Sequence, residues 1–304
     1  MTMSELLAAV TRPLSPDAWV PASRSEYEHV LETLEEGGVE YPTLEYDGFL
    51  KVAIISAAPS PLHGDMVGEL LGRIYGSVTM MPGIDQNIKD GVSISTERTN
   101  TRGGDTSTTR NWDGALIYRA PEGKTLMVAV EVGLSQTYES LKAAISFSVC
   151  ALRCRVGIVM SINEGHRCSV PTRLAAIQEI EHDLDSQLQP SPFGPLRIKE
   201  EIWFGRIAKV VLETYRLDDE PSPPDGAILD PKQSFVRKIG AGLGTNLAEI
   251  TIRDCIPSHI LTGNNIEATP VNFFQRNWFE KTFRDSMIDT AMERVWDRSR
   301  VQRV

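Results

Sequence analysis

The chain has 304 residues, of which 41% are hydrophobic and 24% charged, and its formal net charge is -10. This length and composition suit one large globular domain, or a domain with a substantial extension. The acidic balance argues against a protein that coats nucleic acid by bulk electrostatics, which requires clustered lysine and arginine, although a local basic groove remains compatible with it.

The N-terminal residues 1–19 lack a basic start followed by an apolar run of signal-peptide length. No stretch approaches the roughly 20 apolar residues of a membrane span. We therefore expect an intracellular protein, in the cytoplasm or the nucleus, with no signal peptide and no membrane partner. The four cysteines lack framework spacing and are expected to be reduced thiols.

The first predicted elements are a helix and a hairpin. Residues 24–37 have the apolar spacing and the charge of a surface helix. Residues 41–61 predict a β-hairpin, with Asp47-Gly48 as the turn and VAII as a buried strand. After Pro61, apolar residues at i, i+3, i+4, i+7 and i+8 predict an amphipathic helix. These residues are Val67, Leu70, Leu71, Ile74 and Tyr75.

The next segments predict an α/β core. Residues 91–119 are expected to form short strands joined by the polar loop TERTNTRGGDTSTTRN. An apolar strand at 126–132 precedes a helix at 136–153 and another buried strand at 155–162. Strand, helix and strand in this order build a parallel βαβ unit. On that helix, the predicted buried side chains are Leu141, Ala144, Ile145 and Val149.

The residues after 165 predict a less regular series of helices and strands. Residues 172–187 predict a helix, and residues 196–204 with 207–215 alternate like a hairpin around Gly205. A strand is expected within 246–257 and a helix at 277–300, whose aromatic residues favour docking on the protein's own core over a partner surface. We expect three parts: an N-terminal helical extension (1–39), a core (40–165) and a C-terminal extension packed on it (166–304).

One glutamate stands inside an apolar strand. Glu131 lies in LMVAVEV, where an ionised carboxylate costs several kcal/mol unless it is compensated. A metal ion, a buried salt bridge or a strand edge facing water would each explain it. Asp113 opens the preceding strand, and a short turn between the two strands can bring the acids together. Either Mg²⁺ then bridges them, with water and substrate phosphate completing its shell, or Asp113 caps a turn and Glu131 pairs with an arginine.

A series of segments resembles a known superfamily. They are YDGFLKVAIISAAPSPLHGDMVGELLGRI, WDGALIYR, VAVEVGLSQTYESLKAA and RVGIVMSI. In order and spacing they resemble the restriction-endonuclease-like, PD-(D/E)XK nuclease superfamily, and most closely its Uma-type branch. The resemblance covers about residues 40–163. It implies an α/β fold with a mixed sheet, in which an αβββαβ core is followed here by a C-terminal elaboration of helices and strands.

The resemblance also implies a site. Asp113 and Glu131 would be the acids that bind Mg²⁺ or Mn²⁺. Two positions depart from the pattern: Trp112 replaces the proline before the aspartate, and Gly133 stands where the superfamily places its catalytic lysine. In the Uma-type branch a lysine of the next helix is the substitute, which here is Lys142. Alternatively, Lys142 is a solvated helix residue three positions after Glu139.

Several further residues are candidates with an ordinary alternative. Glu69 could add an acid from the first core helix, or it pairs with Arg73 one turn later. Gln136 and Ser135 could contact substrate or water, or they cap the helix that follows. His63 near a helix start is interpreted as a local cap or surface residue, although the fold implied by the resemblance would place its neighbourhood close to the site. Phosphate contacts, or a solvated loop, would explain the arginines of the polar segment, namely Arg98, Arg102 and Arg110.

Two functions of different classes follow from these patterns. The first is a Mg²⁺-dependent nuclease that hydrolyses phosphodiester bonds in DNA or RNA. The second is a catalytically inactive nuclease-fold protein that serves as a binding or regulatory scaffold. Nucleic acid is the expected partner of the first, and a homodimer is compatible with both.

Overall fold

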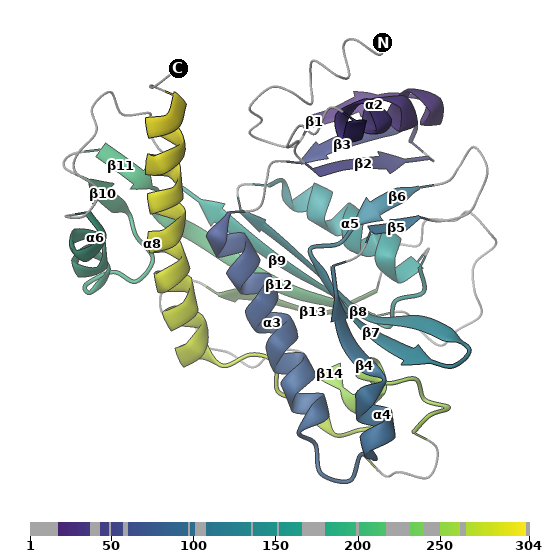
Figure 1. Ribbon diagram of the computed structural model, residues 1–304. Coiled ribbons are helices and arrows are strands. Elements are labelled where there is room, and N and C mark those ends of the chain that lie inside the picture. Colours follow the sequence, from purple (N-terminus) through teal and green to yellow (C-terminus); the bar gives the residue numbers. More distant parts are fainter. Residues whose placement is uncertain are drawn as a thin grey trace. The chain divides into compact units, whose positions relative to one another are not determined.

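The fold is described from a computed structural model of the chain (Figure 1). It divides into two compact units, Met1–Pro59 with Thr96–Trp112 (unit 1) and Ser60–Ser95 with Asp113–Val304 (unit 2). No helix in the described part of the chain is long and apolar enough to cross a membrane. The structure describes residues 18–36, 43–48, 50–56, 60–96, 98–100, 108–134, 136–150, 152–165, 180–198, 201–216, 232–239, 250–261 and 266–301.

Unit 1 is an antiparallel sheet with one helix. Its strand order is β1 (Ala18–Pro21), β3 (Val52–Ser56), β2 (Thr43–Asp47), β6 (Thr109–Asn111) and β5 (Arg98–Asn100). Helix α2 (Arg24–Glu36) buries Tyr27, Val30 and Leu34 against this sheet. The predicted helix and the hairpin at Asp47-Gly48 are therefore confirmed, because β2 and β3 pair in antiparallel register.

Unit 2 contains a six-stranded mixed sheet in the order β13-β12-β9-β8-β7-β4. Strands β8 and β9 are parallel, and the other neighbours are antiparallel. Helix α5 (Tyr138–Cys150) joins β8 to β9, which confirms the predicted βαβ unit. The strands are β4 (Val92–Ser95), β7 (Gly114–Ala120), β8 (Gly123–Leu134), β9 (Val156–Glu164), β12 (Ile207–Arg216) and β13 (Lys232–Ile239).

Two helices cover opposite faces of this sheet. Side chains of successive strand residues point to opposite faces, and the two faces of β8 belong to two different clusters. Val130 and Val132 share one cluster with Leu70 and other residues of α3 (Pro61–Thr79). Ala129 shares the other with the α5 residues, which are Leu141, Ile145 and Val149. Of the predicted helix faces, Ala144 is only half-buried and Tyr75 is exposed.

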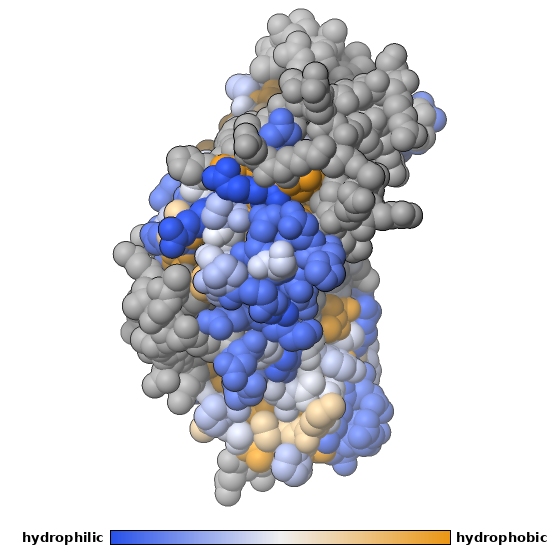
Figure 2. All heavy atoms as spheres, turned by 90° about the vertical axis from the view of Figure 1, so that its left-hand side faces the viewer, coloured by the Kyte–Doolittle hydropathy of each residue, from blue (hydrophilic) through white to orange (hydrophobic). Residues whose placement is uncertain are grey.

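The C-terminal helix α8 (Arg276–Val301) belongs to the core of unit 2. Phe279, Phe283 and Met287 are fully buried in the cluster that also holds α3, so the expected docking of the C-terminal aromatic residues on the core is confirmed for the two phenylalanines. The other side of α8 is polar, and Figure 2 shows that the described part of the face carrying α6 (Ile180–Leu188) and α8 is mostly hydrophilic.

Two C-terminal predictions are wrong. The hairpin around Gly205 does not form, because β11 (Glu201–Phe204) pairs with β10 (Leu196–Ile198), whereas β12 pairs with β9 and β13. Of the expected strand at 246–257 the structure describes residues 250–257, and only Ile250–Thr251 are a strand there (β14), which pairs with β15 (Pro270–Val271). A short helix, α7 (Ile252–Cys255), follows β14, because Asp254 Oδ2 accepts the Thr251 amide at 2.8 Å. One further short helix, α4 (Gln86–Asp90), lies between α3 and β4.

Candidate functional site

Asp113 and Glu131 flank the same register pair of two neighbouring strands. The register pairs Gly114 of β7 with Val130 of β8, Asp113 directly precedes β7, and Glu131 is the residue of β8 after Val130. Asp113 Oδ2 accepts a hydrogen bond of 2.7 Å from the Val132 amide. The connection is tight because Gly123 adopts a φ of 146°, a conformation that other residues rarely reach. The short hairpin thus brings the two predicted acids to adjacent strand positions.

Glu131 points toward the face of the sheet that α5 covers. Along β8 it alternates with Ala129 and Gly133, so all three face the same side of the sheet. Ala129 shares a cluster with Leu141 of α5, and a Cβ atom added at Gly133 would also meet Leu141. Glu131 is 7% exposed. A carboxylate in this position is largely removed from water, so charged groups that approach it interact more strongly than they would in solvent.

His63, whose neighbourhood was expected to lie close to the site, contacts Asp113, a partner that the sequence did not identify. Its Nε2 lies 3.0 Å from Asp113 Oδ1, with the two side chains 17% and 22% exposed. His63 stands in the first turn of α3, where Ser60 caps the helix and accepts the His63 amide at 3.3 Å. The Ser-Pro start of the helix was visible in the sequence, but its position against β7 depends on tertiary packing. His63 is therefore part of the candidate site and not only a surface residue.

The donor chemistry of the site suits a hard divalent cation. Each Asp113 oxygen already has one protein partner, but a carboxylate oxygen carries two lone pairs and can bind once more. Two carboxylates suffice for Mg²⁺, which retains several waters. Among the described residues, no group of three or more histidine, cysteine or acidic side chains is arranged to hold a metal. A cation at this site would depend on the acid pair, water and substrate oxygens.

Gly133 lies close against side chains at the start of α5. A Cβ atom at Gly133 would lie 2.6 Å from Leu141 Cδ1 and 3.0 Å from Gln136 Cβ. Leu141 is buried among the side chains that fix α5 on the sheet. A larger residue at position 133 would therefore collide with these side chains unless they moved.

We expect Gly133→Ala to lower the free energy of unfolding by about 1–3 kcal/mol, as overpacked core sites do. Urea denaturation would measure it. Gly72→Ala is the matched control, because Gly72 lies in α3 with no atom within 4 Å of its added Cβ. That substitution should stabilise the protein by up to about 1 kcal/mol through helix propensity. Equal effects of the two substitutions would contradict the steric explanation.

Lys142 is placed on α5 over an aromatic ring. Its Nζ lies 5.3 Å from the centroid of the Tyr138 ring, one turn earlier in the helix. Lys142 is half-buried, and α5 covers the same face of the sheet to which Glu131 points. Lys142 thus belongs to the helix that covers the face to which Glu131 points, and its amine lies over Tyr138.

A second buried acid, which the sequence analysis missed, holds Tyr138. The Tyr138 hydroxyl donates to Glu213, with 2.5 Å to Oε1, and the Tyr215 hydroxyl lies 2.6 Å from Oε2. Glu213 of β12 is 3% exposed and is in register with Val159, which in turn is in register with Glu131. The signal was present, since Glu213 interrupts an apolar strand as Glu131 does.

Burial, and then the hydrogen bond with Glu213, raise the pKa of Tyr138 from 10.0 to about 12. Between these values the unfolded chain loses a proton that the folded chain keeps, so this tyrosine makes stability fall as pH rises. Its contribution is complete below pH 10. We therefore expect Tyr138→Phe to make the alkaline loss of stability less steep, as measured by urea unfolding across this window. A wild-type minus variant difference that stays constant there would contradict this expectation.

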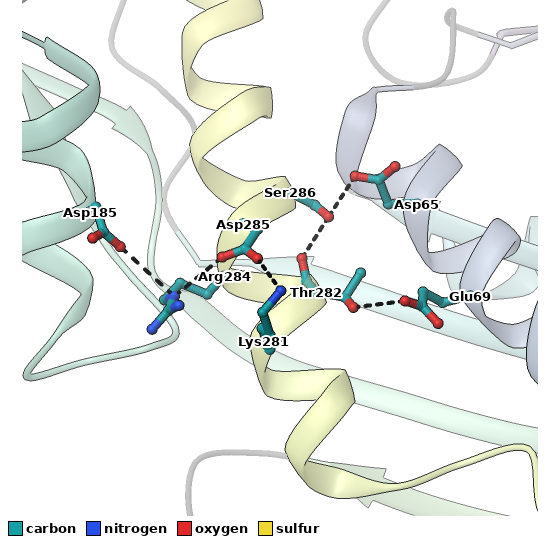
Figure 3. Close-up of polar contacts among 8 residues, drawn as sticks. All are labelled: Asp65, Glu69, Asp185, Lys281, Thr282, Arg284, Asp285 and Ser286. Carbon is teal, nitrogen blue, oxygen red and sulfur yellow. Dashed lines mark hydrogen bonds and ion pairs between the residues drawn. The ribbon is translucent and has the colours of Figure 1, made fainter.

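The remaining candidates are held elsewhere or lie outside the described residues. Glu69 Oε2 is 3.4 Å from Arg73 Nε. Glu69 Oε1 is 3.2 Å from Thr282 Oγ1 of α8, as Figure 3 shows. The alternative pair with Arg73 is thus present, together with a contact to α8. Gln136 Nε2 donates to Ser140 Oγ at 3.3 Å, within the start of α5. Arg98 and Arg110 belong to β5 and β6 of unit 1, whereas Ser135 and Arg102 lie outside the described residues.

Comparisons of the chain with protein families, with curated proteins and with solved structures found no match. The candidate site itself contains two acids that flank one register pair of β7 and β8, a histidine bound to one of these acids, and a lysine on the neighbouring helix.

Proposed function

We propose that the protein is a Mg²⁺-dependent nuclease that hydrolyses phosphodiester bonds in DNA or RNA. The observation that carries this proposal is the placement of Asp113, directly before β7, and Glu131 of β8 on either side of the register pair Gly114–Val130. The element order of unit 2 is a second support. Apart from the short helix α4, the order from α3 through β4, β7, β8, α5 and β9 agrees with the αβββαβ order of the PD-(D/E)XK nucleases that the sequence resembles.

The side chains have distinct roles in this reaction. When bound, Mg²⁺ would polarise the phosphate and lower the pKa of a bound water. Asp113 and Glu131 would hold it, and the Val132 amide and His63 fix Asp113 in one orientation. Such supporting contacts keep a metal-binding side chain in its productive geometry.

Lys142 would stabilise the negative charge that develops on phosphate. Its amine rests on the Tyr138 ring, 5.3 Å from the centroid. Leaving this half-buried ring costs about 1–2 kcal/mol, which an interaction between the amine and a phosphate can offset. In the absence of substrate, the Tyr138 ring thus holds the Lys142 amine in a defined position.

The inactive scaffold is the second candidate, and two observations favour it. Both Asp113 oxygens are already bound by protein groups, and Gly133 leaves no room for the usual lysine. An aspartate whose two oxygens already bind protein groups can stabilise the fold instead of binding a metal ion. The two candidates differ in whether bound metal leads to turnover.

The test combines metal binding with cleavage. Isothermal titration with Mn²⁺ should detect a site, and labelled single- and double-stranded DNA and RNA should be cleaved with Mg²⁺ or Mn²⁺ but not with EDTA. Metal binding without cleavage of any substrate would favour the scaffold. Absence of both would overturn the nuclease proposal.

A further inference from the structure

Helix α8 contacts α3 through a row of three hydroxyl residues, each one turn after the last. The two helices run antiparallel, since successive residues of α8 meet successively earlier residues of α3. Figure 3 shows two of the three contacts. Thr282 Oγ1 lies 3.2 Å from Glu69 Oε1, Ser286 Oγ lies 2.7 Å from Asp65 Oδ2, and Thr290 Oγ1 lies 2.9 Å from the Leu62 amide nitrogen.

The last contact of this row satisfies the start of α3. The first amides of a helix have no partner within it and need an acceptor from elsewhere. Ser60 accepts the amide of His63, and Thr290 accepts that of Leu62. Thr290 is fully buried, and its hydroxyl donates in turn to the Ser286 carbonyl at 2.8 Å. The hydroxyl is thus oriented with its lone pairs toward α3.

The first turn of α3 is also the turn that reaches the candidate site. His63 follows Leu62 directly, and its Nε2 lies 3.0 Å from Asp113 Oδ1. A change in the position of the Leu62 amide therefore moves the backbone that carries His63. Asp113 would then lose one of the two contacts that orient it, and the Val132 amide alone would remain among its described contacts.

We propose that Thr290 is a positioning residue of the acid site, acting through Leu62 and His63 on Asp113. The chemical part of this inference rests on the proposed nuclease function. It gives the C-terminal helix a role in catalysis without any contact to substrate. Because a displacement of about 1 Å at a site can cost about 10²-fold in rate, loss of this contact should be visible in kcat.

The experiment compares Thr290→Val, which has nearly the same shape but no acceptor, with Thr290→Ser, which keeps the hydroxyl. Thr282→Val is the matched control, because it makes the same change in the same helix at the Glu69 contact. Three quantities are measured on the full chain: the imidazole NMR signals of His63 at fixed pH, assigned with His63→Gln, the Kd for Mn²⁺, and kcat and KM separately.

Thr290→Val should shift the His63 signals, weaken Mn²⁺ binding and lower kcat about 10-fold with little change in KM. Thr290→Ser should restore all three, and Thr282→Val should leave them as in the wild type. Unchanged His63 signals in Thr290→Val, or equal changes in Thr282→Val, would overturn the inference. Thr290→Ala removes the same acceptor without an added methyl group and replaces the valine variant if that one does not fold.

The two proposals fail in different ways. If the wild type neither binds Mn²⁺ nor cleaves nucleic acid, the nuclease function is wrong, and the His63 signals still decide whether Thr290 positions this side chain. If the wild type is active and the His63 signals do not respond to Thr290→Val, only the positioning inference is wrong.

Discussion

Asp113→Asn should lower the rate of Mg²⁺-dependent cleavage by about 10²- to 10³-fold, the usual loss when one electrostatic element of a site is removed. Asparagine has nearly the same shape and keeps a carbonyl oxygen for the Val132 amide, which lies 2.7 Å from Asp113 Oδ2. The fold should therefore persist while the charge that binds the cation is lost. Cleavage of labelled substrate and calorimetric Mn²⁺ binding measure the two parts of this expectation.

Two further variants make this result specific. Glu131→Gln should reproduce it, since the second acid contributes the same charge from the neighbouring strand. Asp185→Asn is the control, because Asp185 is half-exposed on α6 and its nearest partner, Arg284 Nε, is 3.9 Å away (Figure 3). Surface pairs of this kind contribute at most about 1 kcal/mol. Full activity and unchanged metal affinity in Asp113→Asn would refute the acid-pair site.

Much of the core could be predicted because its signals are local. The apolar spacing after Pro61 predicted α3, and the order of strand, helix and strand predicted the parallel pairing of β8 with β9. A short hairpin also brings its own ends together, so the adjacency of Asp113 and Glu131 followed from the sequence. These parts depend on interactions between residues close in the chain.

The parts that were missed depend on distant packing. The alternation of residues in β12 is the same whether that strand pairs with residues 201–204 or with β9. It pairs with β9 because both of its faces are then buried in the core of unit 2. His63 and Glu213 likewise acquire their roles from partners far away in the sequence, Asp113 and Tyr138. Local patterns identify such residues as polar, but they do not identify what the residues contact.

The largest loss of stability is expected for Arg294→Leu, about 3–5 kcal/mol, as when one partner of a buried ion pair is removed. Arg294 of α8 binds Glu164 at the end of β9 through Nη1–Oε1 at 3.0 Å and Nη2–Oε2 at 2.9 Å. The Glu164 side chain is 2% exposed. Leucine would leave this carboxylate buried with the Gly205 amide as its one remaining described partner. Urea denaturation gives the free energy of unfolding.

A double substitution separates the charge from the packing. Arg294 also lies over the Phe204 ring and donates to the Trp203 carbonyl, so its removal loses contacts as well as an ion pair. Adding Glu164→Leu to Arg294→Leu removes the stranded carboxylate and should recover part of the loss, because a buried pair can be replaced by apolar residues at low cost. Lys281→Leu is the control, since its exposed pair with Asp285 should contribute less than about 1 kcal/mol. If the double variant is no more stable than Arg294→Leu alone, packing and not the unpaired charge determines how α8 is held on β9.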